Sequence, residues 1–106
     1  MRRSEGVGLF AKKVYAYLKK VPKGKVTTYK ELANTIGSKA YRAVGSALSE
    51  NKDPVKVPCY RVVCSDGTIG RYSAAGGLKK KIELLKKDGI KIKNGKIDLQ
   101  RFGFRF

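Results

Sequence analysis

The chain contains no histidine among its 106 residues. Without an imidazole, no Ser–His pair, Cys–His pair or HExxH zinc site can form, which excludes the chemistry that these groups support. The two cysteines, Cys59 and Cys64, make a poor zinc site on their own, and a thiol pair inside a cell is normally reduced. We therefore expect no metal and no cofactor, and any nucleophile must be activated by a group other than histidine.

The sequence also lacks long apolar runs and has few acidic residues. No segment resembles a transmembrane helix, and the basic residues 1–3 are not followed by the apolar core of a signal peptide, so we expect a cytoplasmic protein without a membrane partner. Eight Asp and Glu stand against 25 Lys and Arg, which gives a formal net charge of +17. Such a charge predicts a nucleic-acid partner, although biased codon usage or adaptation to salt or heat would also enrich lysine.

Apolar residues at helical spacing are frequent in the first half of the chain. Those within residues 10–21 predict a first helix that ends near Pro22. Thr28 and Glu31 have the spacing of a capping box, which predicts the start of a second helix with Tyr29 just inside it.

A break at Gly37 separates this helix from a third one, which ends near Asn51. The apolar stripe of the third helix consists of Ala40, Val44, Ala47 and Leu48. Its opposite face carries Lys39, Tyr41, Arg42 and Ser46. Two short helices joined by a glycine turn are typical of a helix-turn-helix, whose second helix contacts DNA. Arg42 is long enough to reach bases or to fill a gap in their stack, and the small residues Ala43 and Gly45 allow a close approach.

In the second half, β-branched residues between positions 55 and 63 predict short strands around Pro58-Cys59. A loop of small residues, 70–77, leads to a fourth helix that ends at Gly89. Asn94-Gly95, with isoleucines on either side, is a strong signal for a type I′ hairpin.

Two basic segments remain. We expect the lysines of the fourth helix on a solvated face; they are Lys79, Lys80, Lys81, Lys86 and Lys87. In the tail, residues 101–106, aromatic and basic residues alternate, and we expect the phenylalanines to dock on the core instead of stacking on bases.

Cys59 lies in the segment Val57-Pro58-Cys59-Tyr60-Arg61-Val62-Val63. A single cysteine among valines is most often a small buried hydrophobic residue. Here a Tyr-Arg pair follows it, and the positive charge of Arg61 and of nearby lysines favours the thiolate over a thiol whose ordinary pKa is about 8.5. A thiolate is soft and suits displacement at a saturated carbon.

Residues 57–63 closely resemble the PCHRV signature of the O6-alkylguanine-DNA alkyltransferases. Residues 24–29, 42–45 and 70–78 are similar to further segments of that family, and Asn51 stands eight residues before Cys59, as the family's hinge asparagine does. The resemblance covers about residues 8–89 of a single domain, 1–106, and leaves 90–106 as a basic C-terminal hairpin and tail. It implies a mostly α fold with short β segments, the winged helix-turn-helix-like C-terminal domain of these proteins, with the family's N-terminal domain absent.

The resemblance also implies a function, which is a methylated-DNA–protein-cysteine methyltransferase that acts once. The O6-alkyl group of a guanine flipped out of double-stranded DNA moves irreversibly to Cys59, and we expect a monomer. Arg42 takes the place of the flipped base, and Tyr29 stands beside it as a donor to N3. The Ser73 backbone donates to O6, and the carbonyls of Cys59 and Val62 accept from the exocyclic amine. The implied DNA-binding residues further include Tyr41, Ala43, Gly45 and Tyr72.

Two positions depart from the family pattern. Tyr60 stands where the family has a histidine, and Asp88 stands where it has a glutamate. In the family these residues form a relay through a water molecule that generates the thiolate, and the asparagine supports it. A neutral tyrosine is a poor base at pH 7 but can donate a hydrogen bond. We therefore expect an altered relay of Asp88, Tyr60, water and Cys59, supported by Asn51.

Two alternatives remain open. Alkyltransferase-like proteins, which are also short, bind alkylated guanine without repairing it, and they typically have tryptophan at the cysteine position, whereas this chain keeps Cys59. A general helix-turn-helix regulator is the third interpretation; it predicts sequence-specific sites and usually a symmetric dimer.

Overall fold

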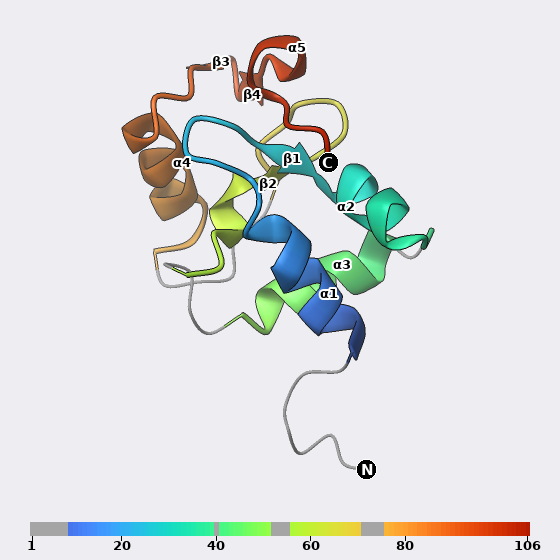
Figure 1. Ribbon diagram of the computed structural model, residues 1–106. Helices are drawn as coiled ribbons and strands as arrows, with labels where there is room; N and C mark the ends of the chain where they lie inside the picture. Colours follow the sequence, from blue (N-terminus) through green and yellow to red (C-terminus); the bar gives the residue numbers. More distant parts are fainter. Residues whose placement is uncertain (1–8, 40, 52–55, 71–75) are drawn as a thin grey trace.

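Most of the chain forms short helices joined by tight turns (Figure 1). The computed structural model describes residues 9–39, 41–51, 56–70 and 76–106. The elements are α1 (Leu9–Leu18), β1 (Thr27–Thr28), α2 (Tyr29–Ile36), α3 (Tyr41–Ser49), the 3-10 helix η2 (Cys59–Arg61), β2 (Val62–Val63), α4 (Gly77–Lys87), β3 (Ile92–Lys93), β4 (Lys96–Ile97) and α5 (Leu99–Phe102). No helix in these ranges is long and apolar enough to cross a membrane. The predicted fold class, mostly helical with short strands, is confirmed.

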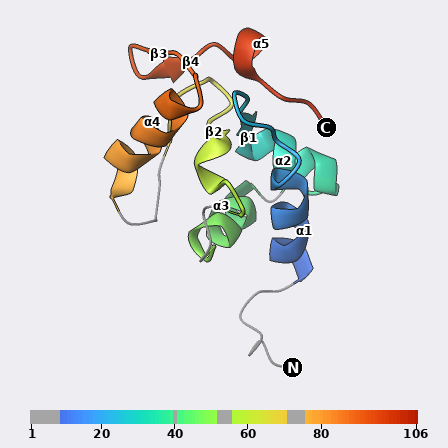
Figure 2. The ribbon, with the colours of Figure 1, turned by 60° about the vertical axis from the view of Figure 1, so that its left-hand side comes forward.

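Helices α1, α2 and α3 pack against one another and enclose the first of two apolar clusters. They form one end of the molecule in Figures 1 and 2. Val14 and Leu18 of α1 are fully buried there, as their helical spacing predicts. The helix ends at Leu18, earlier than predicted, because the N–H of Val21 bonds to the carbonyl of Leu18 in a turn tighter than the α-helical one.

The helix-turn-helix consists of α2 and α3. The Oγ1 atom of Thr28 accepts a hydrogen bond from the N–H of Glu31 at 3.0 Å, as the capping-box spacing predicts. Gly37 ends α2 in a left-handed conformation with φ of 87°, which glycine adopts without strain. On the inward side of α3 the buried residues are Val44, Ala47 and Leu48. Ala40, the other member of the predicted stripe, lies outside the described residues.

A parallel pair of short strands joins the helix-turn-helix to the segment that contains Cys59. Thr27 of β1 is opposite Val62 of β2, and Thr28 is opposite Val63. Strand β1 runs directly into α2, and η2 runs directly into β2. Cys59 is in the turn that leads into β2, and β1 leads into α2. The pairing of the two strands therefore places the Cys59 segment next to the start of the helix-turn-helix.

The C-terminal tail closes the fold beside β1. The N–H of Val26 bonds to the carbonyl of Phe102 at 2.8 Å, and the N–H of Phe104 bonds to the carbonyl of Val26 at 2.7 Å. Phe102 is buried and Phe104 packs against the first cluster, so the predicted docking is confirmed for both. Phe106 is more exposed, and its ring meets that of Tyr17 edge-on at 5.6 Å.

The second apolar cluster lies among α4, the β3–β4 hairpin and α5, at the other end of the molecule (Figure 2). Asn94 and Gly95 have φ values of 54° and 76°, and the strands on either side of them are antiparallel, as predicted for a type I′ hairpin. The predicted solvated face of α4 is wrong for Lys81, which is 0% exposed. Lys81 lies one helical turn before the buried Leu85, so both side chains are on the inward face.

Candidate active site and nucleic-acid interface

Cys59 is the first residue of η2, and only 8% of it is exposed. Pro58 precedes it, and the N–H of Cys59 bonds to the carbonyl of Val57 at 2.7 Å, which turns the chain sharply. The carbonyl of Cys59 accepts the N–H of Val62. Backbone hydrogen bonds thus fix Cys59 through both its N–H and its carbonyl. The residue is buried, so its thiol is shielded from bulk solvent.

Asn51 connects the end of α3 to this segment. Its Nδ2 atom donates to the carbonyl of Val57 at 2.8 Å, the same carbonyl that accepts the N–H of Cys59. The side chain therefore holds the backbone two residues before the sulfur. This contact makes Asn51 a positioning residue for the Cys59 segment, at the site where the hinge asparagine was expected.

Tyr60 and Asp88, the two predicted relay members, are in contact. The phenol of Tyr60 donates to Oδ2 of Asp88 at 2.8 Å. Burial is the main reason why the pKa of Tyr60 rises to about 12, and this hydrogen bond adds to the effect. The side chain of Tyr60 packs in the second cluster, whereas Cys59 packs in the first. Tyr60 therefore gives to Asp88 the hydrogen bond that we expected it to donate towards a Cys59 thiolate.

Asp88 also forms an ion pair with Arg61. The Nε atom of Arg61 donates to Oδ2 of Asp88 at 2.9 Å, and Nη1 donates to the carbonyl of Val21 at 2.9 Å. The two side chains are 15% and 8% exposed, so solvent screens this ion pair little. The expectation that Arg61 favours a thiolate at Cys59 loses its support, because a carboxylate neutralises the guanidinium.

Tyr29, the first residue of α2, lies close to the second thiol. A methyl group placed on Gly70 would lie 3.3 Å from Sγ of Cys64 and 3.5 Å from Oη of Tyr29, so both atoms approach the same glycine. The parallel register explains this proximity, because Cys64 and Tyr29 directly follow paired strands. Sequence reasoning did not place Cys64 in the site. The predicted base-contacting residues Tyr72 and Ser73 lie outside the described residues.

Lys81 is a second residue that sequence reasoning missed. Its Nζ atom donates to the carbonyl of Val62 at 2.7 Å. Burial lowers the pKa of Lys81 to about 8, and the negative charges of ionised Cys64 and Cys59 act in the opposite direction. The only sequence signal was its helical spacing with Leu85. The same Val62 carbonyl is the one predicted to accept from a guanine amine, and that role stays a prediction.

Tyr15 joins α1 to α3 near the same cysteine. Its phenol donates to the carbonyl of Ala47 at 2.6 Å. Burial raises the pKa of Tyr15, and the negative charges of Glu50 and of an ionised Cys59 raise it further. A tyrosine on the first helix thus connects the helix-turn-helix to the surroundings of Cys59.

The outward face of α3 carries the predicted DNA-contacting residues. Tyr41 is 40% exposed, Arg42 is exposed, and Ala43 and Gly45 are half-buried. A Cβ atom on Gly45 would meet no other atom within 4 Å, so packing inside the protein does not require glycine there. Because Gly45 has no side chain, this face of α3 has a low surface, which leaves room for a partner to approach the helix backbone closely.

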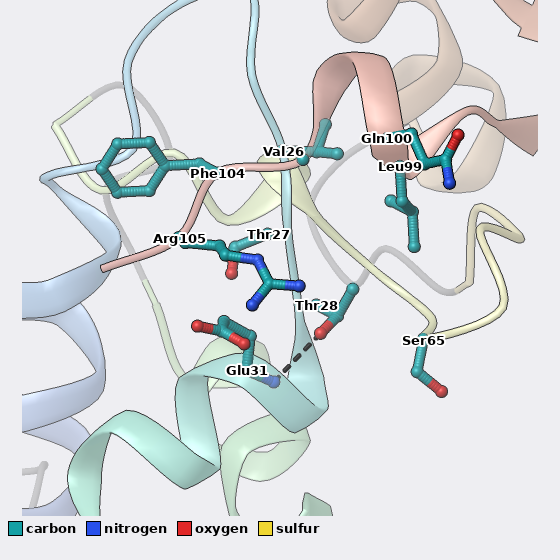
Figure 3. A pocket seen from close by; sticks show the side chains of 10 residues that line it. Val26, Thr27, Thr28, Glu31, Ser65, Leu99, Gln100, Phe104 and Arg105 are labelled. Atoms are coloured by element: carbon teal, nitrogen blue, oxygen red, sulfur yellow. Dashed lines mark hydrogen bonds between the residues drawn. The ribbon is translucent and has the colours of Figure 1, made fainter.

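A separate cleft of about 590 Å³ opens between β1, the start of α2 and the tail (Figure 3). The side chain of Glu31 comes from α2 and that of Arg105 from the tail, and both line the cleft. Cys59 is not among its lining residues, so the cleft is distinct from the cysteine site. Within the described ranges, no three His, Cys, Asp or Glu side chains gather as a metal site would require.

These features define a class of protein: a helix-turn-helix domain with a buried, positioned cysteine beside it. Residues 9–90 match the family described as "6-O-methylguanine DNA methyltransferase, DNA binding domain", and the chain belongs to this family. The resemblance inferred from the sequence over about residues 8–89 is thereby confirmed.

Relatives extend this assignment. The chain is 49% identical over 92 residues to a bifunctional methyltransferase/endonuclease of Picrophilus torridus, which covers 86% of this chain and 30% of the relative. It is similar to the O6-methylguanine-DNA methyltransferase structure of Pyrococcus kodakaraensis KOD1, with 46% identity, a TM-score of 0.72, and coverage of 83% of this chain and 50% of that one. It is also similar to S. pombe Atl1 in complex with damaged DNA containing O6-carboxymethylguanine, with 30% identity, a TM-score of 0.82 and full coverage of both chains. The chain thus spans about a third of the first protein and half of the second.

Proposed function

We propose that this chain repairs DNA by transferring the O6-alkyl group of a flipped-out guanine to Cys59. The observation that carries the proposal is the buried, backbone-held cysteine beside the helix-turn-helix in a member of this family. The sulfur forms a bond to the alkyl carbon, the bond from that carbon to O6 breaks, and its electron pair stays on guanine. Because the thioether is stable, each molecule acts once.

Binding of double-stranded DNA is supported by charge and by the shape of α3. The net charge of +17 attracts phosphates, and the exposed side chains of Tyr41 and Arg42 stand beside the low surface at Ala43 and Gly45. The Atl1 relative was solved on damaged DNA. Flipping a base costs a few kcal/mol of unstacking, and Arg42, inserted in its place, offsets that cost.

Around the flipped base, we assign recognition to Tyr29, Val62, Tyr72 and Ser73. The phenol of Tyr29 donates to guanine N3 and the backbone of Ser73 to O6, which stabilises the negative charge on the leaving base. The Val62 carbonyl accepts from the exocyclic amine. A single chain supplies all of these groups, so we expect a monomer.

A second candidate is lesion binding without transfer, which the likeness to alkyltransferase-like proteins implies. Two observations favour it: the full coverage by the Atl1 structure, and the phenol of Tyr60, which binds Asp88 and cannot act as the family's histidine does. Retention of Cys59 favours transfer.

One experiment separates the candidates. The protein is mixed with duplex DNA that contains a single O6-methylguanine, and intact and peptide masses are measured. We expect one methyl group on the peptide that contains Cys59, none in Cys59→Ser, and a methyl group still on that peptide in Cys64→Ser, the matched thiol control. Lesion-selective binding without a mass change would establish the second candidate, and equal binding of lesion-free duplex would exclude both.

A further inference from the structure

The cleft between β1, the start of α2 and the tail is separate from the Cys59 site, and the proposed function leaves it without a role. Thr27, Thr28 and Ser65 contribute hydroxyl groups to its wall, and Arg105 contributes a guanidinium (Figure 3). Hydroxyl and guanidinium groups donate hydrogen bonds to phosphate oxygens. The wall therefore suits a ligand with several oxygen acceptors.

One polar atom of this wall has no partner in the protein. Thr27 is 2% exposed, and within the described parts of the chain its Oγ1 atom forms no hydrogen bond. Such an atom is destabilising when buried, so it is rare in folded proteins unless water or a ligand satisfies it. Thr28, in contrast, uses its Oγ1 atom to accept the N–H of Glu31. The hydroxyl of Thr27 is thus a second sign, besides the guanidinium, that the cleft takes a ligand.

The tail holds Arg105 at the cleft. Backbone hydrogen bonds join Val26 to Phe102 and to Phe104. The rings of Phe104 and Phe106 meet edge-on at 5.3 Å, which places both on one side of the tail, while Arg105 between them lines the cleft. Because the residues on either side are docked, the backbone of Arg105 loses little freedom when its side chain binds a ligand.

Glu31 brings a negative charge to the same cleft. The ion pairs among the described residues lie elsewhere, so the guanidinium of Arg105 is not paired with the Glu31 carboxylate. Seen from outside, the two charges nearly cancel, and a small free anion gains little by entering. A phosphodiester that other contacts already hold in place does not depend on this long-range attraction. The cleft therefore suits a phosphate that is part of DNA better than a free phosphate ion.

The cleft also lies where a DNA strand is expected to pass. In a helix-turn-helix the second helix enters the major groove and the first helix crosses the backbone. Here α2 is the first helix, and Thr28 and Glu31 place its N-terminal end at the cleft. That end carries the positive pole of the helix dipole, which attracts phosphate. Arg105 lies beyond the matched residues 9–90, so the family match assigns it no role.

We propose that this cleft binds a phosphate of the DNA backbone, and that Arg105 is its principal donor. The proposal rests on the proposed function, because the duplex bound at α3 presents this phosphate. The guanidinium of Arg105 and the hydroxyl groups of the wall donate to the non-bridging oxygens, and no covalent bond changes. Such a contact fixes the position of the duplex on the helix-turn-helix and adds affinity that depends on neither sequence nor lesion.

The salt dependence of DNA binding tests the proposal. Affinity for a lesion-free duplex is measured by fluorescence anisotropy between about 50 and 200 mM salt. We expect Arg105→Gln to lower the affinity about three- to tenfold and to reduce the slope of log K against log salt concentration by about 0.9, the value of one phosphate contact. Arg101→Gln is the matched control: this exposed arginine of the same tail lies over the Phe102 ring at 5.0 Å and does not line the cleft. Its slope should equal that of the unmodified protein. An Arg105→Gln slope equal to that of Arg101→Gln would overturn the proposal.

A second variant predicts a change in the opposite direction. Glu31→Gln removes the negative charge from the cleft but keeps the backbone N–H that Thr28 accepts. We therefore expect severalfold tighter binding of the same duplex, and weaker binding by the folded variant would contradict a phosphate in this cleft. Circular dichroism and thermal melting show whether each variant is folded.

Inorganic phosphate distinguishes DNA from a free anion. We expect the duplex to shift the backbone amide NMR signals of residues 27–31, and inorganic phosphate at the same phosphate concentration to leave them in place. Shifts caused by inorganic phosphate alone would overturn the assignment to DNA. An unmodified protein that binds no duplex would overturn the proposed function as well. Unchanged duplex binding by Arg105→Gln, with methyl transfer to Cys59 intact, would overturn the phosphate site alone.

Discussion

At the scale of single residues, two departures from the family pattern compensate each other. Tyrosine is longer than the histidine it replaces, and aspartate is shorter than glutamate, so Tyr60 and Asp88 still meet at 2.8 Å. Asp88 also binds Arg61, which ties η2 to the end of α4. The contact therefore has a clear structural role.

Tyr60→Phe tests this structural role. The variant keeps the buried ring but removes the donor to Asp88, so we expect a loss of about 1.5 kcal/mol in the free energy of unfolding at neutral pH. The folded-state pKa of Tyr60 is raised to about 12, so its stabilising effect is complete below about pH 10 and is lost as the pH rises through 12. Urea denaturation at pH 7 and above pH 10 should therefore show a difference that shrinks at alkaline pH. A constant difference would contradict the assignment.

At the scale of elements, α3 serves two surfaces with different requirements. Its inward side is closely packed, with Val44 fully buried, while its outward side carries Arg42 beside the open position of Gly45. Glycine in the middle of a helix costs roughly 0.5–1 kcal/mol relative to alanine. Among the described residues no packing contact requires that glycine, which agrees with the proposed close approach of DNA at this position.

Gly45→Ala separates stability from binding. Helix propensity predicts a gain of about 0.5–1 kcal/mol in the free energy of unfolding, because among the described residues no atom outside the helix's own backbone lies within 4 Å of the new Cβ. We expect affinity for lesion-containing duplex to fall severalfold, as measured by fluorescence anisotropy. Unchanged affinity, with the protein folded, would show that DNA does not approach α3 at this position.

At the scale of the whole molecule, the two apolar clusters are joined through one short pair of strands. The parallel pair of β1 and β2 lies between them, and the tail binds Val26 immediately before β1 (Figure 1). Cys59 and Tyr60, adjacent in sequence, therefore belong to different clusters. The chain as a whole has a formal net charge of +17.

This charge predicts a steep dependence of DNA binding on salt. If six or more phosphates are contacted, affinity for lesion-free duplex should fall by about a thousandfold or more between about 50 and 200 mM salt. A titration by anisotropy gives the slope of log K against log salt concentration. A shallow slope would favour the alternative that the lysines only adapt the surface to codon usage, salt or heat.

Much of the fold could be predicted because its signals are local. The capping pair Thr28 and Glu31, the glycine at position 37 and the Asn94-Gly95 turn each act within a few residues, and each appears as expected. The predicted end of α1, near Pro22, was less accurate. The helix ends at Leu18, since the tight turn that follows depends on how the next segment packs.

The candidate site could be predicted only as a set of residues. Cys59, Asn51 and Arg42 were found from spacing and family resemblance. Their contacts were not predictable, because they join segments far apart in the chain. Asn51 holds the backbone of the Cys59 segment, and the register of two strands brings Cys64 and Tyr29 to the same glycine, Gly70.

The sequence alone thus determined the helix-turn-helix, the hairpin, the positive charge and the family, since these follow from local periodicity, turn chemistry, composition and motif order. Only the tertiary structure decided which ionisable groups surround the cysteine. It directs Tyr60 and Arg61 to Asp88 and turns Lys81 inward to the Val62 carbonyl. The physical reason is that burial and long-range pairing set charge and proton affinity, and neither is encoded in the spacing of neighbouring residues.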